Sequence, residues 1–189
     1  LHLAYGNPTK SMETLFPSWK GYQERIQHEW DSHIKEEDLV ILPGDLSWAM
    51  RLEEALPDLA FLANRPGTKV LVKGNHDYWW DTATKVRKAL PEKIHIIHND
   101  VFYERGIAIA GARLWDTPEY SFSSIINFQG NPEQEKKEAP SREEQAKIFE
   151  RELLRLETSL QLLPKEAPIK IAATHFPPIG LSLAPSRAS

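Results

Sequence analysis

Three short apolar segments of the sequence run directly into side chains that could bind a metal ion or transfer a proton. The segments and the residues that follow them are 39–42 with Gly44-Asp45, 69–72 with Gly74-Asn75-His76-Asp77, and 169–173 with Thr174-His175. In open α/β sheets, ligands bind outside the carboxyl ends of the strands. If the three segments are strands of such sheets, we expect their polar residues to meet at one rim.

The types of side chain at this rim suit divalent metal ions. Carboxylate, amide oxygen and imidazole are ligands for moderately hard ions such as Mn²⁺, Fe²⁺ or Zn²⁺. The chain has no cysteine, so thiolate catalysis and cysteine-based zinc sites are excluded. A carboxylate such as Asp45 can bridge two ions about 3.5–4 Å apart, an arrangement that clamps a phosphoryl group. Glycines before Asp45 and Asn75 allow the backbone to turn sharply and approach the ions.

These blocks resemble those of one enzyme family. The Gly-Asp, Gly-Asn-His-Asp and Thr-His blocks are similar to those of calcineurin-like metallophosphoesterases, and Leu1-His2 resembles the end of the family's first Asp-x-His block. The four blocks occur in the family's order and span nearly the whole chain. The likeness is strongest to small bacterial predicted phosphohydrolases.

The resemblance implies a centre of two divalent metal ions, most simply Mn, Fe or Zn. By position, Asp45 would bridge both ions and His2 would hold the first ion. Asn75 and His175 would hold the second ion. A metal-bound hydroxide would attack the phosphorus in line.

The same likeness assigns catalytic positions to the two residues after Asn75. His76 would contact the phosphate and stabilise or protonate the leaving oxygen, and Asp77 would position its neighbour without binding metal. The implied activity is a metal-dependent phosphohydrolase that cleaves a phosphomonoester, phosphodiester or pyrophosphate bond of a small phosphorylated substrate.

Two other functions are weighed against this one. A degenerate member of the family could keep the fold as a protein-interaction scaffold, although the intact metal-ligand types argue against it. A nucleotide-binding module would need a glycine-rich phosphate loop, and neither common form of that loop occurs. The run Leu46-Ser47-Trp48 after Asp45 also lacks the Asp-Arg pair of protein Ser/Thr phosphatases.

The ends of the chain depart from the family pattern. The family's first Asp would precede Leu1, and its closing Gly-His-x-His block would follow Ser189. We therefore expect residues 1–189 to be a single-domain fragment that lacks the first strand, the C-terminal strands and three metal ligands.

Helical patterns lie between the apolar segments, which indicates an α/β fold. A first helix is expected to start at residues 16–18 and end at Asp38, and a second to be split by Pro57. Residues 82–90 form a short helix. Thirty residues separate Asp45 from Asn75, enough for one crossover helix between parallel neighbouring strands.

The middle and end of the chain predict further elements. Strands are expected at 94–97, 101–103 and 107–110, with a hairpin turn at 104–106, and residues 129–140 read as a mobile loop. Ser141 and Glu144 form a capping box for a long helix. Its predicted buried stripe is Phe149, Leu153, Leu156, Leu160 and Leu163. For the whole domain, the resemblance implies a four-layer α/β/β/α sandwich.

Composition limits the partners. Net charge is −4 without a basic cluster, which disfavours binding to a nucleic-acid duplex. No apolar run reaches the roughly 18 residues of a membrane span, and a cytoplasmic location fits; oligomeric state is left open. Trp48, Trp79, Trp80 and Trp115 lie beside the motifs and either line a substrate pocket or pack the sheet. Arg113 and Asp116 are further candidates for the rim.

Overall fold

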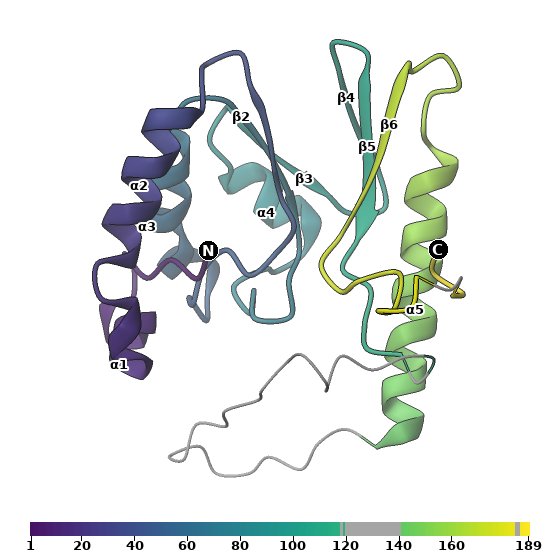
Figure 1. Ribbon diagram of the computed structural model, residues 1–189, viewed down its shortest axis with the longest axis horizontal. Helices are drawn as coiled ribbons and strands as arrows, with labels where there is room; N and C mark the ends of the chain where they lie inside the picture. Colours follow the sequence, from purple (N-terminus) through teal and green to yellow (C-terminus); the bar gives the residue numbers. More distant parts are fainter. Residues whose placement is uncertain (118, 120–140, 184–185) are drawn as a thin grey trace.

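The computed structural model describes residues 1–117, 119, 141–183 and 186–189, and the predicted loop at 129–140 lies outside these residues. The described chain is a mixed α/β structure with two three-stranded sheets, and helices lie along the outer side of each sheet (Figure 1).

The first sheet is parallel and has the order β1-β2-β3. Its strands are β1 (Leu39–Leu42), β2 (Thr68–Val72) and β3 (Ile94–Ile97). Helix α3 (Leu52–Ala63) connects β1 to β2, and α4 (Ala83–Ala89) connects β2 to β3. The parallel pairing of β1 with β2 confirms the prediction drawn from the spacing between Asp45 and Asn75.

The second sheet combines a hairpin with a parallel strand. Strands β4 (Val101–Glu104) and β5 (Ile107–Ala112) are antiparallel, and β6 (Ile169–Thr174) runs parallel to β5. The predicted hairpin turn is confirmed: Arg105 and Gly106 have φ values of 49° and 80°. Two left-handed residues in succession match the right-handed twist of the strands that such a turn joins.

The first helix differs from its prediction at both ends. Pro17 belongs to a separate 3₁₀ turn, η2 (Pro17–Trp19), and α2 (Tyr22–His33) begins only after Gly21, which has a φ of 69°. The helix ends before Ile34, which is extended, and not at Asp38. The turns η1 (Pro8–Lys10) and α1 (Met12–Leu15) precede η2.

The predicted break of α3 at Pro57 is wrong, because the helix continues through it from Leu52 to Ala63. Proline removes one hydrogen bond, to the carbonyl of Glu53. Both Glu53 and Pro57 are exposed, so water can solvate that carbonyl. Burial of Leu59 and Leu62 on the opposite face holds the helix together.

The long helix α5 (Arg142–Gln161) begins with the predicted capping box of Ser141 and Glu144. Two members of the predicted stripe are wrong: Leu160 is 36% exposed, and Leu163 lies beyond the end of the helix and is only partly buried. Glu152 and Ser159 are buried instead. Glu152 pairs with Arg113, which follows β5, and the Ser159 hydroxyl accepts from the N–H of Gly111 in β5 at 2.9 Å.

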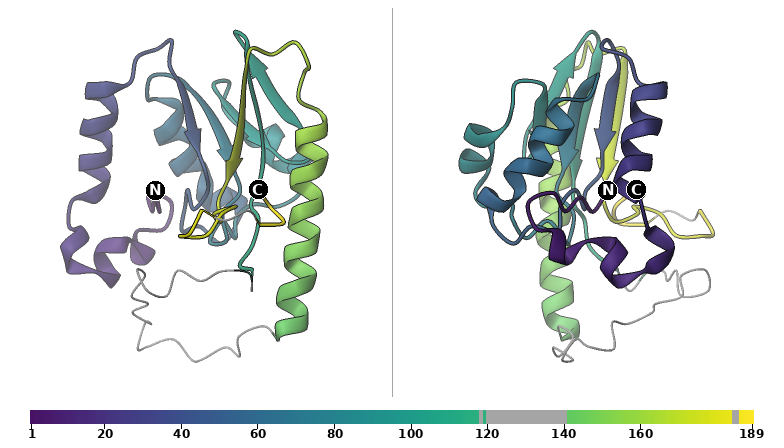
Figure 2. Two further views of the ribbon diagram at one scale, coloured as in Figure 1. Left: turned by 45° about the vertical axis from the view of Figure 1, so that its right-hand side comes forward. Right: turned by 90° about the vertical axis from the view of Figure 1, so that its left-hand side faces the viewer.

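Both faces of β2 are buried, since residues along a strand alternate between its faces. Leu71 packs in a cluster with α2, α3 and α4, whereas Val70 and Val72 pack with Ile109 of β5 and Ala173 of β6. A third cluster joins Leu156 of α5 to the end of β5. Figure 2 shows α2, α3 and α4 beside the first sheet and α5 beside the second.

The carboxyl ends of β1, β2, β5 and β6 lie at one edge of the molecule (Figure 1), where the predicted site residues follow them. Within the described part of the chain, no helix is both long and apolar enough to cross a membrane.

Candidate metal centre

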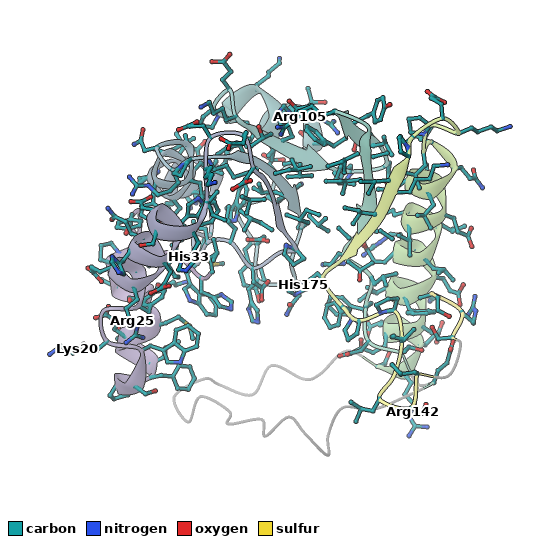
Figure 3. The ribbon with its side chains drawn as sticks, turned by 45° about the horizontal axis from the view of Figure 1, so that its top comes forward. Lys20, Arg25, His33, Arg105, Arg142 and His175 are labelled. Carbon is teal, nitrogen blue, oxygen red and sulfur yellow. The ribbon has the colours of Figure 1, made fainter. Side chains whose placement is uncertain are left out.

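The predicted site residues meet where three strands end. Asp45 follows β1, Asn75 and His76 follow β2, and His175, labelled in Figure 3, follows β6. His2 joins them because its segment runs beside residues 45–48: the His2 N–H donates to the Asp45 carbonyl at 2.8 Å, and Leu3 pairs with Ser47 in a parallel bridge. All four predicted metal ligands are therefore neighbours in space.

The carboxylate of Asp45 lies between the two halves of the cluster. Its Oδ2 is 3.7 Å from His2 Nε2, and its Oδ1 is 3.5 Å from His175 Nε2. Oδ1 also accepts a hydrogen bond from the backbone N–H of His76 at 2.9 Å. The carboxylate thus faces a histidine with each oxygen, as a shared ligand would.

His175 is oriented by a backbone carbonyl. Its Nδ1 lies 2.8 Å from the carbonyl oxygen of Pro43, and a carbonyl can only accept, so Nδ1 carries the proton. In the neutral ring Nε2 then carries the lone pair, which is the state a metal ligand needs. Nε2 lies 2.7 Å from Oδ1 of Asn75, so two acceptors face each other unless a proton or a cation is shared between them.

His2 is held on several sides. Its ring stacks on Trp48 with the centroids 4.6 Å apart, and the Tyr22 hydroxyl donates to its carbonyl. Burial lowers the pKa of His2, which favours the neutral imidazole. Its Nδ1 is buried without a hydrogen-bond partner among the described residues.

Asp77 organises the loops and is 1% exposed. Its Oδ2 accepts from the N–H groups of Gly74 at 2.7 Å and Asp45 at 2.9 Å, and its Oδ1 accepts from Leu46 at 2.8 Å and from the Trp79 indole at 3.0 Å. One carboxylate therefore ties the loop after β1 to the loop after β2, and it does not face His2 or His175.

The two glycines before Asp45 and Asn75 are required by close approach. A Cβ at Gly74 would lie 2.1 Å from Asp45 Oδ1, and a Cβ at Gly44 would lie 2.6 Å from His175 Nδ1. Gly44 has a φ of 101°, and Asp45 itself is left-handed with a φ of 51°. Strained backbone of this kind clusters at functional sites.

His76 lies beside the cluster and contacts aromatic rings. Its ring packs edge-on to Trp48 at 5.1 Å and to Tyr78 at 6.0 Å between centroids. Its Nδ1 is buried and has no hydrogen-bond partner in the part of the chain that the structure describes. Tyr78 is 55% exposed, so this side of the cluster opens to solvent.

The side chains of the cluster form partial ligand sets for divalent ions. No group of three or more His, Asp or Glu side chains among the described residues could hold an ion alone. Each half of the cluster instead offers Asp45 with one histidine, and the half at His175 adds the amide oxygen of Asn75. These imidazoles and oxygens fit Mn²⁺, Fe²⁺ or Zn²⁺ as partial ligand sets.

Sequence reasoning missed one support of the site, the pair of Ser47 and Asp58. Both are fully buried; Ser47 donates to Asp58, which also accepts from the N–H of Tyr5 at 2.8 Å. Burial raises the pKa of Asp58. The sequence contained a sign of this pair, because Asp58 is a carboxylate among the buried, mostly apolar residues of α3.

The tryptophans divide between the two interpretations. Trp79 and Trp80 are 1% and 5% exposed and belong to the core beneath α4, whereas Trp48 stacks on His2. Of the two rim candidates, Asp116 is exposed, and Arg113 forms an ion pair with Glu152.

Comparison with known proteins identifies the family. The model of the calcineurin-like phosphoesterase family matches residues 1–188, so this chain belongs to that family. A phage protein, the gene 66 protein of Mycobacterium phage D29, is 31% identical over 77 residues, which cover 41% of this chain and 37% of that protein. The chain therefore spans little more than a third of that relative's length.

A crystal structure of a protein of unknown function from Aquifex aeolicus, AQ665, is also similar. The match has 23% sequence identity and a TM-score of 0.37, and it covers 62% of this chain and 59% of the other.

Proposed function

We propose that this chain is the site-bearing part of a metal-dependent phosphohydrolase that cleaves phosphomonoester, phosphodiester or pyrophosphate bonds with two divalent ions. Family membership supports the reaction class. The observation that carries the proposal is the position of Asp45, which has one carboxylate oxygen near His2 and the other near His175.

The proposed roles follow from the contacts. Asp45 would be shared between the ions, with His2 on one side and Asn75 and His175 on the other. Bound divalent ions would neutralise phosphate charge and lower the pKa of a water molecule toward ~7. Asp77 would hold the loop of Asp45 in place through its backbone hydrogen bonds.

His76 would act on the substrate and not on the metal. Its unpartnered Nδ1 and its place beside solvent-exposed Tyr78 suit a group that meets the phosphate and assists the leaving oxygen. General acid assistance of this kind contributes about 10²–10⁴-fold to rate.

The proposal is tested by hydrolysis of p-nitrophenyl phosphate, bis-p-nitrophenyl phosphate and pyrophosphate with and without Mn²⁺. We expect activity that a chelator abolishes and that Asp45→Asn removes together with bound metal. Asp81→Asn is the matched control, because Asp81 is exposed and pairs only locally with Lys85. His76→Gln should keep the metal content and lose about 10²-fold or more of the rate.

The outcomes separate this function from its alternative. Loss of metal with full activity in His76→Gln would contradict the assigned role of His76. A chain that binds neither metal nor substrate, in the longest form that folds, would favour a scaffold that has lost catalysis.

The proposal includes the four-layer α/β/β/α sandwich. It is supported by the three clusters in succession: between α2, α3, α4 and the first sheet, between the two sheets, and between α5 and the second sheet.

A further inference from the structure

A small cavity lies beside the candidate metal centre, between the ends of β2, β3 and β5 and the middle of α5. Its volume is about 20 Å³, which is room for about one water-sized group. We call it the basic pocket; it is lined by Lys73, Ile97, His98, Asn99, Gly111, Ala112, Arg113, Glu152 and Arg155. The function described above uses none of these side chains.

Positive charge exceeds negative charge around the basic pocket. Glu152 is 1% exposed, and its Oε1 accepts from Arg113 at 3.0 Å and from Arg155 at 2.9 Å, while Arg151 lies 3.5 Å away. Lys73 adds a further ammonium group, whose hydrogen bond to the Trp80 carbonyl is long, at 3.3 Å. Three arginines thus contact Glu152, and two of them, Arg113 and Arg155, line the pocket together with Lys73.

The neighbouring carboxylates only partly offset this excess. Asp77 is an electrostatic neighbour of Lys73, and it accepts from backbone N–H groups through both oxygens. Asp100 pairs with Arg87. Arg113 keeps a buried Nε without a hydrogen-bond partner among the described residues, so the pocket has an unused donor and uncompensated charge.

Two backbone connections link the basic pocket to the metal centre. Lys73 is separated from Asn75 by Gly74 alone, and the carbonyl of Arg113 accepts the N–H of Phe176, the residue after His175, at 2.9 Å. A phosphate held at the metal centre would therefore have this cationic pocket as its neighbour.

We propose that the basic pocket is a second anion site that accepts the oxygens of a phosphate group. Arginine and lysine donors that face one cavity are the usual partners of phosphate oxygens. The volume admits the oxygen edge of one oxyanion and excludes a base or sugar ring. The phosphate comes either from a substrate that carries two phosphates or from free inorganic phosphate. The first source rests on the proposed phosphohydrolase function, whereas the binding of phosphate to the pocket does not depend on that function.

Binding is measured first without metal, by isothermal titration calorimetry of the full chain with inorganic phosphate in EDTA at constant ionic strength. We expect saturable binding that Lys73→Met weakens about tenfold or more, since a charge-assisted hydrogen bond is lost. Arg155→Gln is the second variant, placed on α5 away from the metal loops. Lys85→Met, at an exposed lysine, should bind phosphate as the unaltered chain does.

The source of the phosphate is then distinguished by kinetics with Mn²⁺. If a two-phosphate substrate uses the pocket, Lys73→Met raises KM for pyrophosphate or a nucleoside diphosphate about tenfold and leaves KM for p-nitrophenyl phosphate unchanged. Equal KM effects, with the binding in EDTA still lost, assign the pocket to inorganic phosphate. Absence of saturable binding by the unaltered chain in EDTA, or unchanged binding by both Lys73→Met and Arg155→Gln, overturns the site whether or not the chain hydrolyses phosphoesters.

Discussion

At the scale of single residues, the site depends on groups that fix ligands as much as on the ligands. Asp77 accepts backbone N–H groups from two loops, and the Pro43 carbonyl sets the tautomer of His175. The family resemblance predicted that Asp77 positions its neighbour His76 without binding metal, whereas its hydrogen bonds go to Gly74, Asp45, Leu46 and Trp79. The contact between the Pro43 carbonyl and His175 was not predictable, because every residue has a backbone carbonyl and residue type does not mark it.

Asp77→Asn tests this positioning role. An asparagine presents an NH₂ group where the carboxylate accepts N–H donors, so buried donors lose their partner. We expect the free energy of unfolding to fall by about 1–3 kcal/mol, measured by urea denaturation of the metal-free chain. Asp81→Asn, the same change at an exposed position, should stay within about 0.5 kcal/mol. Equal effects at both positions would show that Asp77 does not organise the loops.

At the scale of elements, local signals predicted structure well and tertiary contacts accounted for the errors. The capping box of α5 and the turn at Arg105-Gly106 depend on neighbouring residues, and both are present. The predicted apolar stripe of α5 included Leu160, which is exposed, and left out Glu152, which is buried. Glu152 forms ion pairs with Arg113, which follows β5, and with Arg155 of α5. The spacing of apolar residues along a helix does not reveal an ion-pair partner from another element, so it could not predict that Glu152 is buried.

Glu152 fastens α5 to the end of β5. Its replacement by glutamine leaves Arg113 and Arg155 without their buried counter-charge, and breaking a buried ion pair costs about 3–5 kcal/mol. We expect Glu152→Gln to lower the unfolding free energy by about that amount in urea denaturation. Glu157→Gln is the matched control on the same helix, where the side chain is exposed. A change below 1 kcal/mol at Glu152 would mean that the pair contributes little to the attachment of α5.

At the scale of the whole molecule, the two sheets share one apolar layer. The buried strands were predictable from unbroken apolar runs, because such runs are typical of strands covered on both faces. Which strands lie in which sheet was not predictable, since Val72 and Ile109 are far apart in the sequence and meet only after folding. The expectation of a single domain stays a prediction.

That expectation can be tested through the shared layer. Ile109 is 0% exposed between the sheets, and Ile169, in the neighbouring strand β6, is 51% exposed. Ile109→Ala should lower the unfolding free energy by about 2–5 kcal/mol, within a single cooperative transition followed by both tryptophan fluorescence and circular dichroism. Ile169→Ala should have a much smaller effect. Two separate transitions would indicate that the sheets unfold independently.

The left-handed backbone conformation of Asp45 limits which amino acids can occupy that position. Among residues with a side chain, asparagine and aspartate tolerate a φ of 51° most readily, and only aspartate also brings a negative charge. Replacing Asp45 with asparagine therefore removes the charge and keeps the backbone conformation. Alanine or valine would change both the side-chain chemistry and the backbone conformation. The backbone conformation and the proposed metal binding favour the same amino acid here, so most substitutions at Asp45 are expected to disturb both.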